Sequence, residues 1–137
     1  MTVRLFEAED AARVAEIQAA SREASQWNVQ SDPAYECLVI EIDGDSVAGF
    51  LLSRQTALGE RELLNLAIHP NLRVRGNGRR LLQTALERWP GTWYLEVRES
   101  NHAAIALYKA VGFRMCGRRE RYYHNPPEAG IVMKYVS

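Results

Sequence analysis

The 137-residue sequence has few of the residues that crosslink small proteins or bind metal ions. Its two cysteines, Cys37 and Cys116, have no cysteine or histidine beside them, and its three histidines are scattered. This spacing matches neither a zinc site nor a redox pair, so we expect no metal and interpret both cysteines as buried free thiols. A chain of this length buries roughly two thirds of its unfolded surface, which permits folding without such links.

Long apolar segments and linkers are also missing. The longest apolar run, around residues 47–52, is far shorter than the ~20 residues that span a bilayer. The first residues lack the basic and apolar regions of a signal peptide, and no low-complexity run or repeat interrupts the chain. We therefore expect a single domain over residues 1–137, no membrane segment and a cytoplasmic location.

The sequence carries no net charge, with 17 basic and 17 acidic side chains. The balance is a cancellation, because residues 1–70 hold 5 basic and 12 acidic side chains whereas residues 71–137 hold 12 and 5. This asymmetry predicts a C-terminal half that meets an anion and an N-terminal half that meets a cation; a solvated surface of mixed sign is the alternative. No basic patch interleaved with aromatics supports direct nucleic-acid binding.

Apolar periodicity and glycine and proline boundaries indicate alternating strands and helices. Strands are expected over residues 3–6, 37–42, 47–52, 62–68, 92–98, 113–121 and 131–136. Helices are expected over residues 8–20 and 79–89, and between an Asn101 N-cap and Gly112. Antiparallel strands followed by strand–helix–strand units predict an α+β (mixed α/β) fold, in which a mixed, mostly antiparallel sheet has helices on both faces.

The segment 73–79, between a strand and a helix, is the most informative part of the sequence. Gly76 and Gly78 let the backbone approach a ligand, and the free N–H groups at a helix start bind anions. Four arginines accompany them without an acid, namely Arg73, Arg75, Arg79 and Arg80. The pattern predicts a site for a phosphorylated ligand such as a pyrophosphate; a tight turn or a solvated basic face are the alternatives. The spacing excludes a P-loop and a dinucleotide fingerprint.

Three motifs carry a family resemblance. Arg73-x-x-Gly76-x-Gly78 resembles motif A, Gln/Arg-x-x-Gly-x-Gly/Ala, of the GNAT superfamily of acetyl-CoA-dependent N-acetyltransferases. Residues 93–113 resemble the LEVRxSNxxAIxLYxxxGF run of the ribosomal-protein alanine N-acetyltransferases within it, and residues 118–123 resemble the RRxYY segment that follows. The matches cover about half the chain, in one order.

The resemblance implies a GNAT-like sheet and acetyl-CoA as cosubstrate, without a metal. It places the pyrophosphate on the N–H groups of residues 74–79 and pairs the pantetheine arm with a strand backbone as an extra strand. The implied cofactor-binding residues are Leu66, Ala67, Ile68, Arg73, Val74, Arg75, Gly76, Asn77, Gly78, Arg79 and Asn101.

Acetyl transfer to an amine needs a base for the amine proton and an acid for the leaving thiolate. The resemblance assigns Glu96 as the base, directly or through a water, and Tyr108 as the acid. Spacing alone allows other interpretations: Glu96 as a solvent-facing residue paired with Arg98 or Arg118, and Tyr108 as a core residue. No Ser-His or Cys-His arrangement suggests a covalent intermediate, so attack on the thioester would be direct.

We therefore expect an N-acetyltransferase that acts on a primary amine, with the N-terminal α-amine of a ribosomal or other protein as the leading acceptor. A small amine (a polyamine, amino acid or amino sugar) is an alternative acceptor. A non-catalytic acyl-CoA-binding regulatory module is an alternative of another class. The short polar segment 21–33 departs from the second helix that the family usually has, which leaves peptide specificity open. We expect a monomer or homodimer.

Overall fold

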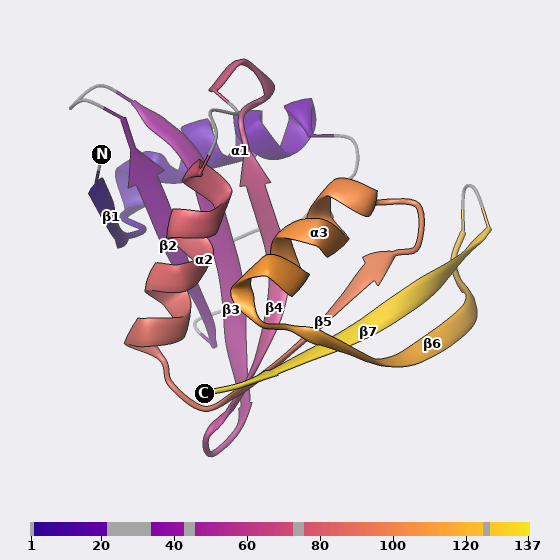
Figure 1. Cartoon of the computed structure of the whole chain (residues 1–137). Coiled ribbons are helices and arrows are strands. Elements are labelled where there is room, and N and C mark those ends of the chain that lie inside the picture. Colours follow the sequence, from indigo (N-terminus) through magenta and orange to yellow (C-terminus); the bar gives the residue numbers. More distant parts are fainter. Residues whose placement is uncertain (1, 22–33, 43–45, 73–75, 125–126) are drawn as a thin grey trace.

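A computed structural model describes residues 2–21, 34–42, 46–72, 76–124 and 127–137. These residues form a seven-stranded sheet with the order β1-β2-β3-β4-β5-β7-β6 (Figure 1). Its strands are β1 (Thr2–Leu5), β2 (Tyr35–Glu41), β3 (Val47–Ala57), β4 (Glu60–Ile68), β5 (Thr92–Arg98), β6 (Arg114–Tyr123) and β7 (Glu128–Val136). The helices are α1 (Ala11–Ala20), α2 (Asn77–Arg88) and α3 (His102–Val111), with short 3-10 turns at Ala8–Asp10 and Pro70–Leu72.

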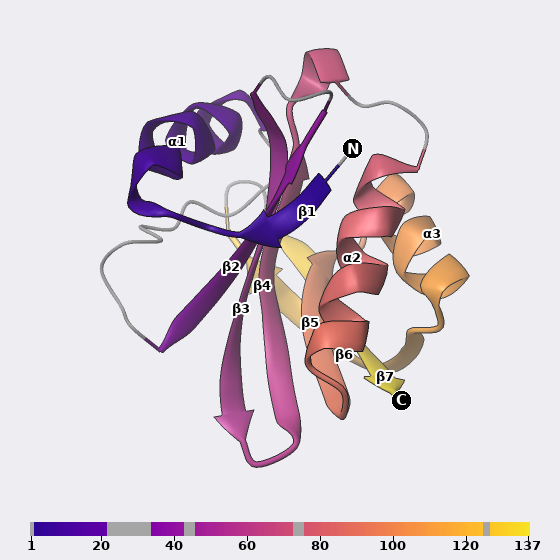
Figure 2. The ribbon, with the colours of Figure 1, turned by 90° about the vertical axis from the view of Figure 1, so that its left-hand side faces the viewer.

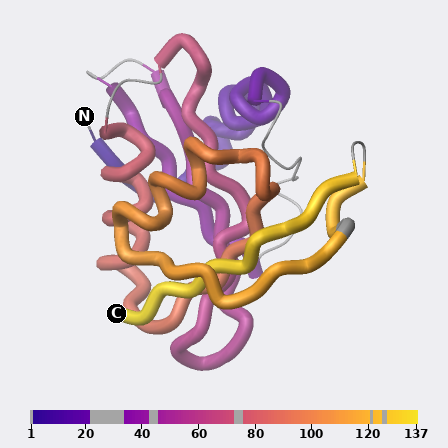
Figure 3. The backbone as a smooth tube through the Cα atoms, turned by 45° about the vertical axis from the view of Figure 1, so that its right-hand side comes forward, coloured from indigo at the N-terminus to yellow at the C-terminus, as the bar shows by residue number. Residues whose placement is uncertain are grey.

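Neighbouring strands are antiparallel except for β4 and β5, which run parallel. Helix α1 lies on one face of the sheet, and α2 and α3 lie on the other (Figure 2). The predicted fold class is therefore confirmed, including helices on both faces. The β6–β7 hairpin forms the edge of the sheet opposite β1 (Figure 3).

The core has two layers, one on each face of the sheet. In β2, Cys37 and Val39 point into the layer under α1, whereas Leu38 and Ile40 point into the layer under α2. A strand that is buried on both faces has a continuous apolar sequence, as β2 has. The layer under α2 and α3 also holds Trp93, which is fully buried.

Strand β3 continues to Ala57, well past the end predicted at residue 52. Its last residues are exposed and polar, so they carry no apolar alternation. They are held by backbone pairing with β4 and by an ion pair of 2.9 Å between Arg54 and Glu62. The prediction was wrong because pairing, and not burial, extends this strand.

The ladder between β4 and β5 is short. Only residues 60–62 of β4 pair with residues 92–94 of β5. Just beyond them, the register of β4 with β3 skips Leu64, which marks a β-bulge. A bulge bends its strand and increases the local twist. Among the described strands, none therefore pairs with residues 64–68 of β4 on the β5 side, and the sheet opens there (Figure 1).

Three sequence predictions concern the cysteines, membrane segments and metal binding. Cys37 is buried as predicted, but Cys116 is exposed, because it lies on the edge strand β6. No helix within the described ranges is long and apolar enough to cross a membrane. In the same ranges, no group of three or more His, Cys, Asp or Glu side chains could hold a metal ion.

Candidate active site

The glycine turn places the start of α2 beside the opening in the sheet. Gly76 has a φ of 96°, a left-handed conformation that favours glycine, and α2 begins at the next residue. The first helical hydrogen bond runs from Arg80 N–H to Gly76 O at 2.9 Å, so the N–H groups of residues 77–79 have no helical partner. This geometry fits the predicted anion site. Arg73, Val74 and Arg75 lie outside the described residues.

The side chain of Asn77 packs inside the protein. It is buried, and its Nδ2 donates to Leu72 O at 3.3 Å. Its Oδ1 is buried and has no hydrogen-bond partner among the described residues. The backbone N–H of Asn77 belongs to the free N–H groups at the start of α2. The side chain of Arg79, two residues further on, is exposed.

Helix α3 begins and ends at the predicted residues. The side chain of Asn101 accepts from Ala104 N–H at 3.2 Å, which is an N-cap hydrogen bond. Gly112 closes the helix with a φ of 123°, and a Cβ there would press on the Tyr135 ring at 3.1 Å. These two ends fix the position of α3 against the opening.

A cavity of about 210 Å³ lies between β4 and the first turns of α2 and α3. Six predicted site residues share it: Leu66, Ala67, Ile68, Gly78, Asn101 and Tyr108. Ser21, at the end of α1, lines it as well. Ser21 lies at the end of α1, which covers the other face of the sheet, whereas α2 and α3 cover the first face. The cavity therefore extends through the opening between β4 and β5.

This cavity fits an extended ligand with a phosphate at one end. Residues 66 and 67 present a strand edge with no β5 partner among the described residues, so they can pair with an amide-bearing chain. Gly78 keeps the cavity open beside Ile68 and Leu107, since a Cβ there would already be in van der Waals contact with Leu107. The helix start at residues 77–79 supplies the anion-binding end.

Tyr108 is both a core residue and a cavity residue. It is 8% exposed, and its ring packs on Phe113 with 5.8 Å between ring centroids. Burial raises the pKa of Tyr108 above its ordinary value, and the neighbouring Tyr123 raises it further. The phenol therefore keeps its proton at neutral pH and can act as a donor.

Glu96 faces the side of the sheet that α1 covers. Its neighbours Leu95 and Val97 belong to the core layer under α2 and α3, so alternation turns Glu96 the other way. Its side chain is 18% exposed, and Arg119 Nη2 lies 3.3 Å from its Oε1. The sequence indicated Arg98 or Arg118 as the partner, whereas Arg118 pairs with Glu99 and Glu120 on the other side of β6.

Glu96 also lines a cavity of its own, about 260 Å³ in volume. Its other lining residues are Thr56, Glu60, Glu62, Tyr94, Leu95, Arg119 and Val132. The Oε2 atom of Glu96 is buried and has no hydrogen-bond partner among the described residues. A carboxylate oxygen in this state can accept a proton or a hydrogen bond from a ligand.

Tyr123 links the two candidate catalytic residues. Burial, followed by the Glu96 carboxylate and Tyr122, raises the pKa of Tyr123 to about 12. The same phenol contributes to the raised pKa of Tyr108. Glu96 and Tyr108 lie on opposite faces of the sheet. The Tyr123 phenol is close enough to interact electrostatically with both.

Sequence reasoning missed Ser21 and Arg119. Ser21 is 1% exposed, and its Oγ has no hydrogen-bond partner among the described residues. It stood at the border of a polar segment of uncertain form, so no local pattern identified it. Arg119 belongs to an arginine-rich strand in which sequence alone does not show which side chain turns toward Glu96.

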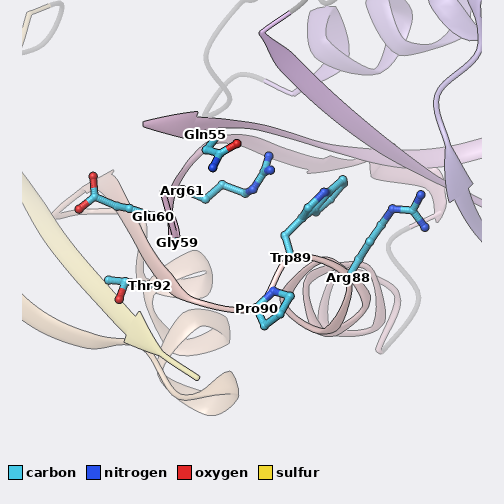
Figure 4. A pocket seen from close by; sticks show the side chains of 8 residues that line it. All are labelled: Gln55, Gly59, Glu60, Arg61, Arg88, Trp89, Pro90 and Thr92. Atoms are coloured by element: carbon cyan, nitrogen blue, oxygen red, sulfur yellow. The ribbon is translucent and has the colours of Figure 1, made fainter. Parts of the chain in front are cut away.

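A third cavity, at the other end of β4, has a structural explanation (Figure 4). The buried Arg61 lies there with its guanidinium 4.5 Å from the Trp89 ring centroid. It also donates to Glu36 at 2.8 Å and to Ser53 Oγ at 3.2 Å. Its charge is satisfied within the protein, so this cavity does not require a ligand.

Residues 3–113 match the model of the acetyltransferase (GNAT) family. The chain therefore belongs to this family, as the motifs predicted. The ribosomal protein bS18-alanine N-acetyltransferase of Salmonella typhimurium is 42% identical over 83 residues, which cover 58% of this chain and 55% of that protein. The chain thus spans about half the length of this curated relative in the match.

Two further likenesses extend over nearly the whole chain. A Bacillus subtilis protein, provisionally named ribosomal protein bS18-alanine N-acetyltransferase, is 34% identical over 142 residues, covering 96% of this chain and 92% of its own. The crystal structure of the ribosomal-protein-S18-alanine N-acetyltransferase from Escherichia coli matches with a TM-score of 0.85 and 28% identity. That match covers 98% of this chain and 92% of the other.

Proposed function

We propose that the protein transfers the acetyl group of acetyl-CoA to a primary amine, and that the acceptor is the N-terminal α-amine of a protein. The opening between β4 and β5 is the observation that carries this proposal. One cavity reaches it from the side of α2 and α3, and the Glu96 carboxylate lies on the other face. Membership of the GNAT family and relatives named alanine N-acetyltransferases support it.

Bound acetyl-CoA would supply a thioester acyl group and a thiolate leaving group. In our proposal, the backbone of Leu66, Ala67 and Ile68 pairs with its extended arm, and Asn101 contributes its amide. The N–H groups of residues 77–79 hold the pyrophosphate, because a helix start favours negative charge. Arg73, Val74, Arg75, Gly76 and Arg79 complete the set from the sequence motif.

Two side chains then manage the protons. Glu96 accepts the proton of the acceptor ammonium at its carboxylate, directly or through a water, and so exposes the nitrogen lone pair. Tyr108 retains its phenolic proton at neutral pH and donates it toward the leaving sulfur. Attack is direct, without a covalent enzyme intermediate.

The test is thiol release from acetyl-CoA with a panel of acceptors. We expect peptides that begin with Ala to release coenzyme A faster than polyamines, amino acids or amino sugars. E96Q and Y108F should each lower kcat by about 10²- to 10⁴-fold, the range for a lost acid or base, and leave acetyl-CoA binding intact.

Matched variants separate catalysis from folding. E120Q removes an exposed carboxylate, and Y135F removes a hydroxyl from the other ring that packs on Phe113. Both should keep kcat within about twofold of the parent, as surface changes do. Rejection of every peptide in favour of a small amine would overturn the protein acceptor. If the parent binds acetyl-CoA but releases coenzyme A with no acceptor, and E96Q and Y108F leave that binding unchanged, the result would point instead to a non-catalytic acyl-CoA-binding module.

A further inference from the structure

The ion pair between Arg119 and Glu96 is weak and accessible. The Arg119 side chain is 59% exposed, and it meets Glu96 through Nη2 at 3.3 Å. Partly exposed pairs of this kind contribute little stability, because water solvates both charges and the long side chain is mobile. A second partner lies close by, since the Arg119 guanidinium is 5.2 Å from the Tyr122 ring centroid. The guanidinium can therefore leave Glu96 at low cost.

The surroundings of Glu96 favour a cation. The charged and titratable side chains near it on the packed strands are Glu60 and Glu62 on β4, Tyr94 and Arg98 on β5, Arg119 and Tyr123 on β6, and Lys134 on β7. Lys134 lies over the Tyr94 ring, and Arg98 pairs with Glu128, so both cations have other partners. The cavity itself is lined by three carboxylates and the one guanidinium of Arg119.

We propose that Arg119 occupies, in the free protein, the place at Glu96 that the ammonium group of the acceptor takes, and that acceptor binding displaces it toward Tyr122. The inference rests on the proposed function, because it takes Glu96 as the base. Arg119 is then a built-in competitor of the acceptor.

The pairing can be measured without any substrate. Carbon-13 NMR of glutamate-labelled protein resolves the side-chain carboxyl groups at neutral pH, and E96Q assigns the Glu96 signal. In R119Q, the carboxyl signal of Glu96 at neutral pH should move, because the guanidinium beside its Oε1 is gone. R118Q removes the same charge from the neighbouring residue, which pairs with Glu99 and Glu120, and should leave the Glu96 signal unchanged.

Kinetics then test the displacement. If the acceptor displaces Arg119, R119Q should lower the acceptor KM by about twofold to fivefold, the range for loss of a partly exposed ion pair, because the competitor is gone. It should leave kcat unchanged, because Arg119 no longer contacts Glu96 in the complex. R118Q should leave both constants unchanged.

The NMR and kinetic experiments test the pairing and the displacement separately. An unchanged Glu96 carboxyl signal in R119Q overturns the pairing, and this result does not depend on whether any amine is acetylated. A lowered kcat, or an acceptor KM that is unchanged or raised, overturns the displacement. If no amine releases coenzyme A, the proposed function fails while the NMR signal still tests the pair.

Discussion

Burial affects the two candidate catalytic side chains differently. Tyr108 is surrounded by the core, and burial raises its pKa, which suits a group that must hold a proton. Glu96 is only partly covered, and its Oε2 has no hydrogen-bond partner among the described residues, which leaves one oxygen able to accept a proton. Their placement on opposite faces of the sheet lets two reactants approach from different sides.

The two cysteines should differ sharply in reactivity. Burial raises the pKa of Cys37 to about 12, so its thiolate is scarce near neutral pH. Cys116 is exposed on β6. We expect iodoacetamide to modify one thiol per native chain and two in guanidinium chloride, as counted by mass spectrometry.

C116S provides the control for this labelling. It should take up no label in the native state. Two labels per native parent chain would show that Cys37 becomes accessible through local opening.

At the scale of elements, α3 shows how one residue can serve both stability and a ligand site. The Oδ1 atom of Asn101 caps the helix, while the residue itself lines the cavity. The cap uses one end of the side-chain amide and leaves Nδ2 for other partners.

Substitution of Asn101 can therefore separate the two roles. N101A should lower the free energy of unfolding by about 1 kcal/mol, because the cap is lost. N101D should keep the cap, since Asp caps helices as well as Asn, but weaken acetyl-CoA binding by placing a negative charge near an anion. Urea denaturation and calorimetric titration measure the two effects. Equal acetyl-CoA affinity in N101D and the parent would contradict a role of Nδ2.

Sequence predicts the elements whose ends depend on local bonds. Asn101 and Gly112 mark α3 because the cap and the left-handed turn involve only neighbouring residues. The bulge at Leu64 left no such mark, because Leu63, Leu64 and Leu66 are all apolar and fit either register. The opening of the sheet, on which the candidate site depends, therefore became visible only in the structure. The motifs identified Glu96 and Tyr108, but not their separation by the sheet.

At the scale of the whole molecule, the charge division near residue 70 follows the architecture. The acidic part of the chain builds β1 to β4 and α1, and the basic part builds α2 to β7. Glu60 and Glu62 bring the acidic part to the cavity of Glu96. Asp43 and Asp45, which belong to the same acidic half, lie outside the described residues.

Neutralising these carboxylates tests electrostatic steering of the acceptor. E60Q/E62Q should raise the acceptor KM several-fold at low ionic strength, and the difference should vanish near 1 M salt, where the Debye length is about 3 Å. E87Q/E120Q removes the same charge from two exposed positions away from this cavity and should leave KM unchanged. A salt-independent KM in the parent would mean that the acidic half does not guide the acceptor.

The three-residue ladder between β4 and β5 also has a mechanical consequence. A sheet that is hydrogen-bonded along its full width resists bending more than one whose two parts are hydrogen-bonded at one end. Among the described residues, strands β1 to β4 are hydrogen-bonded to strands β5 to β7 only over this ladder, with the bulge at Leu64 beside it, and the core layer under α2 and α3 packs against both parts. A ligand that pairs with β4 would add backbone hydrogen bonds away from this ladder. These bonds would stiffen the molecule by restricting movement between the two parts of the sheet.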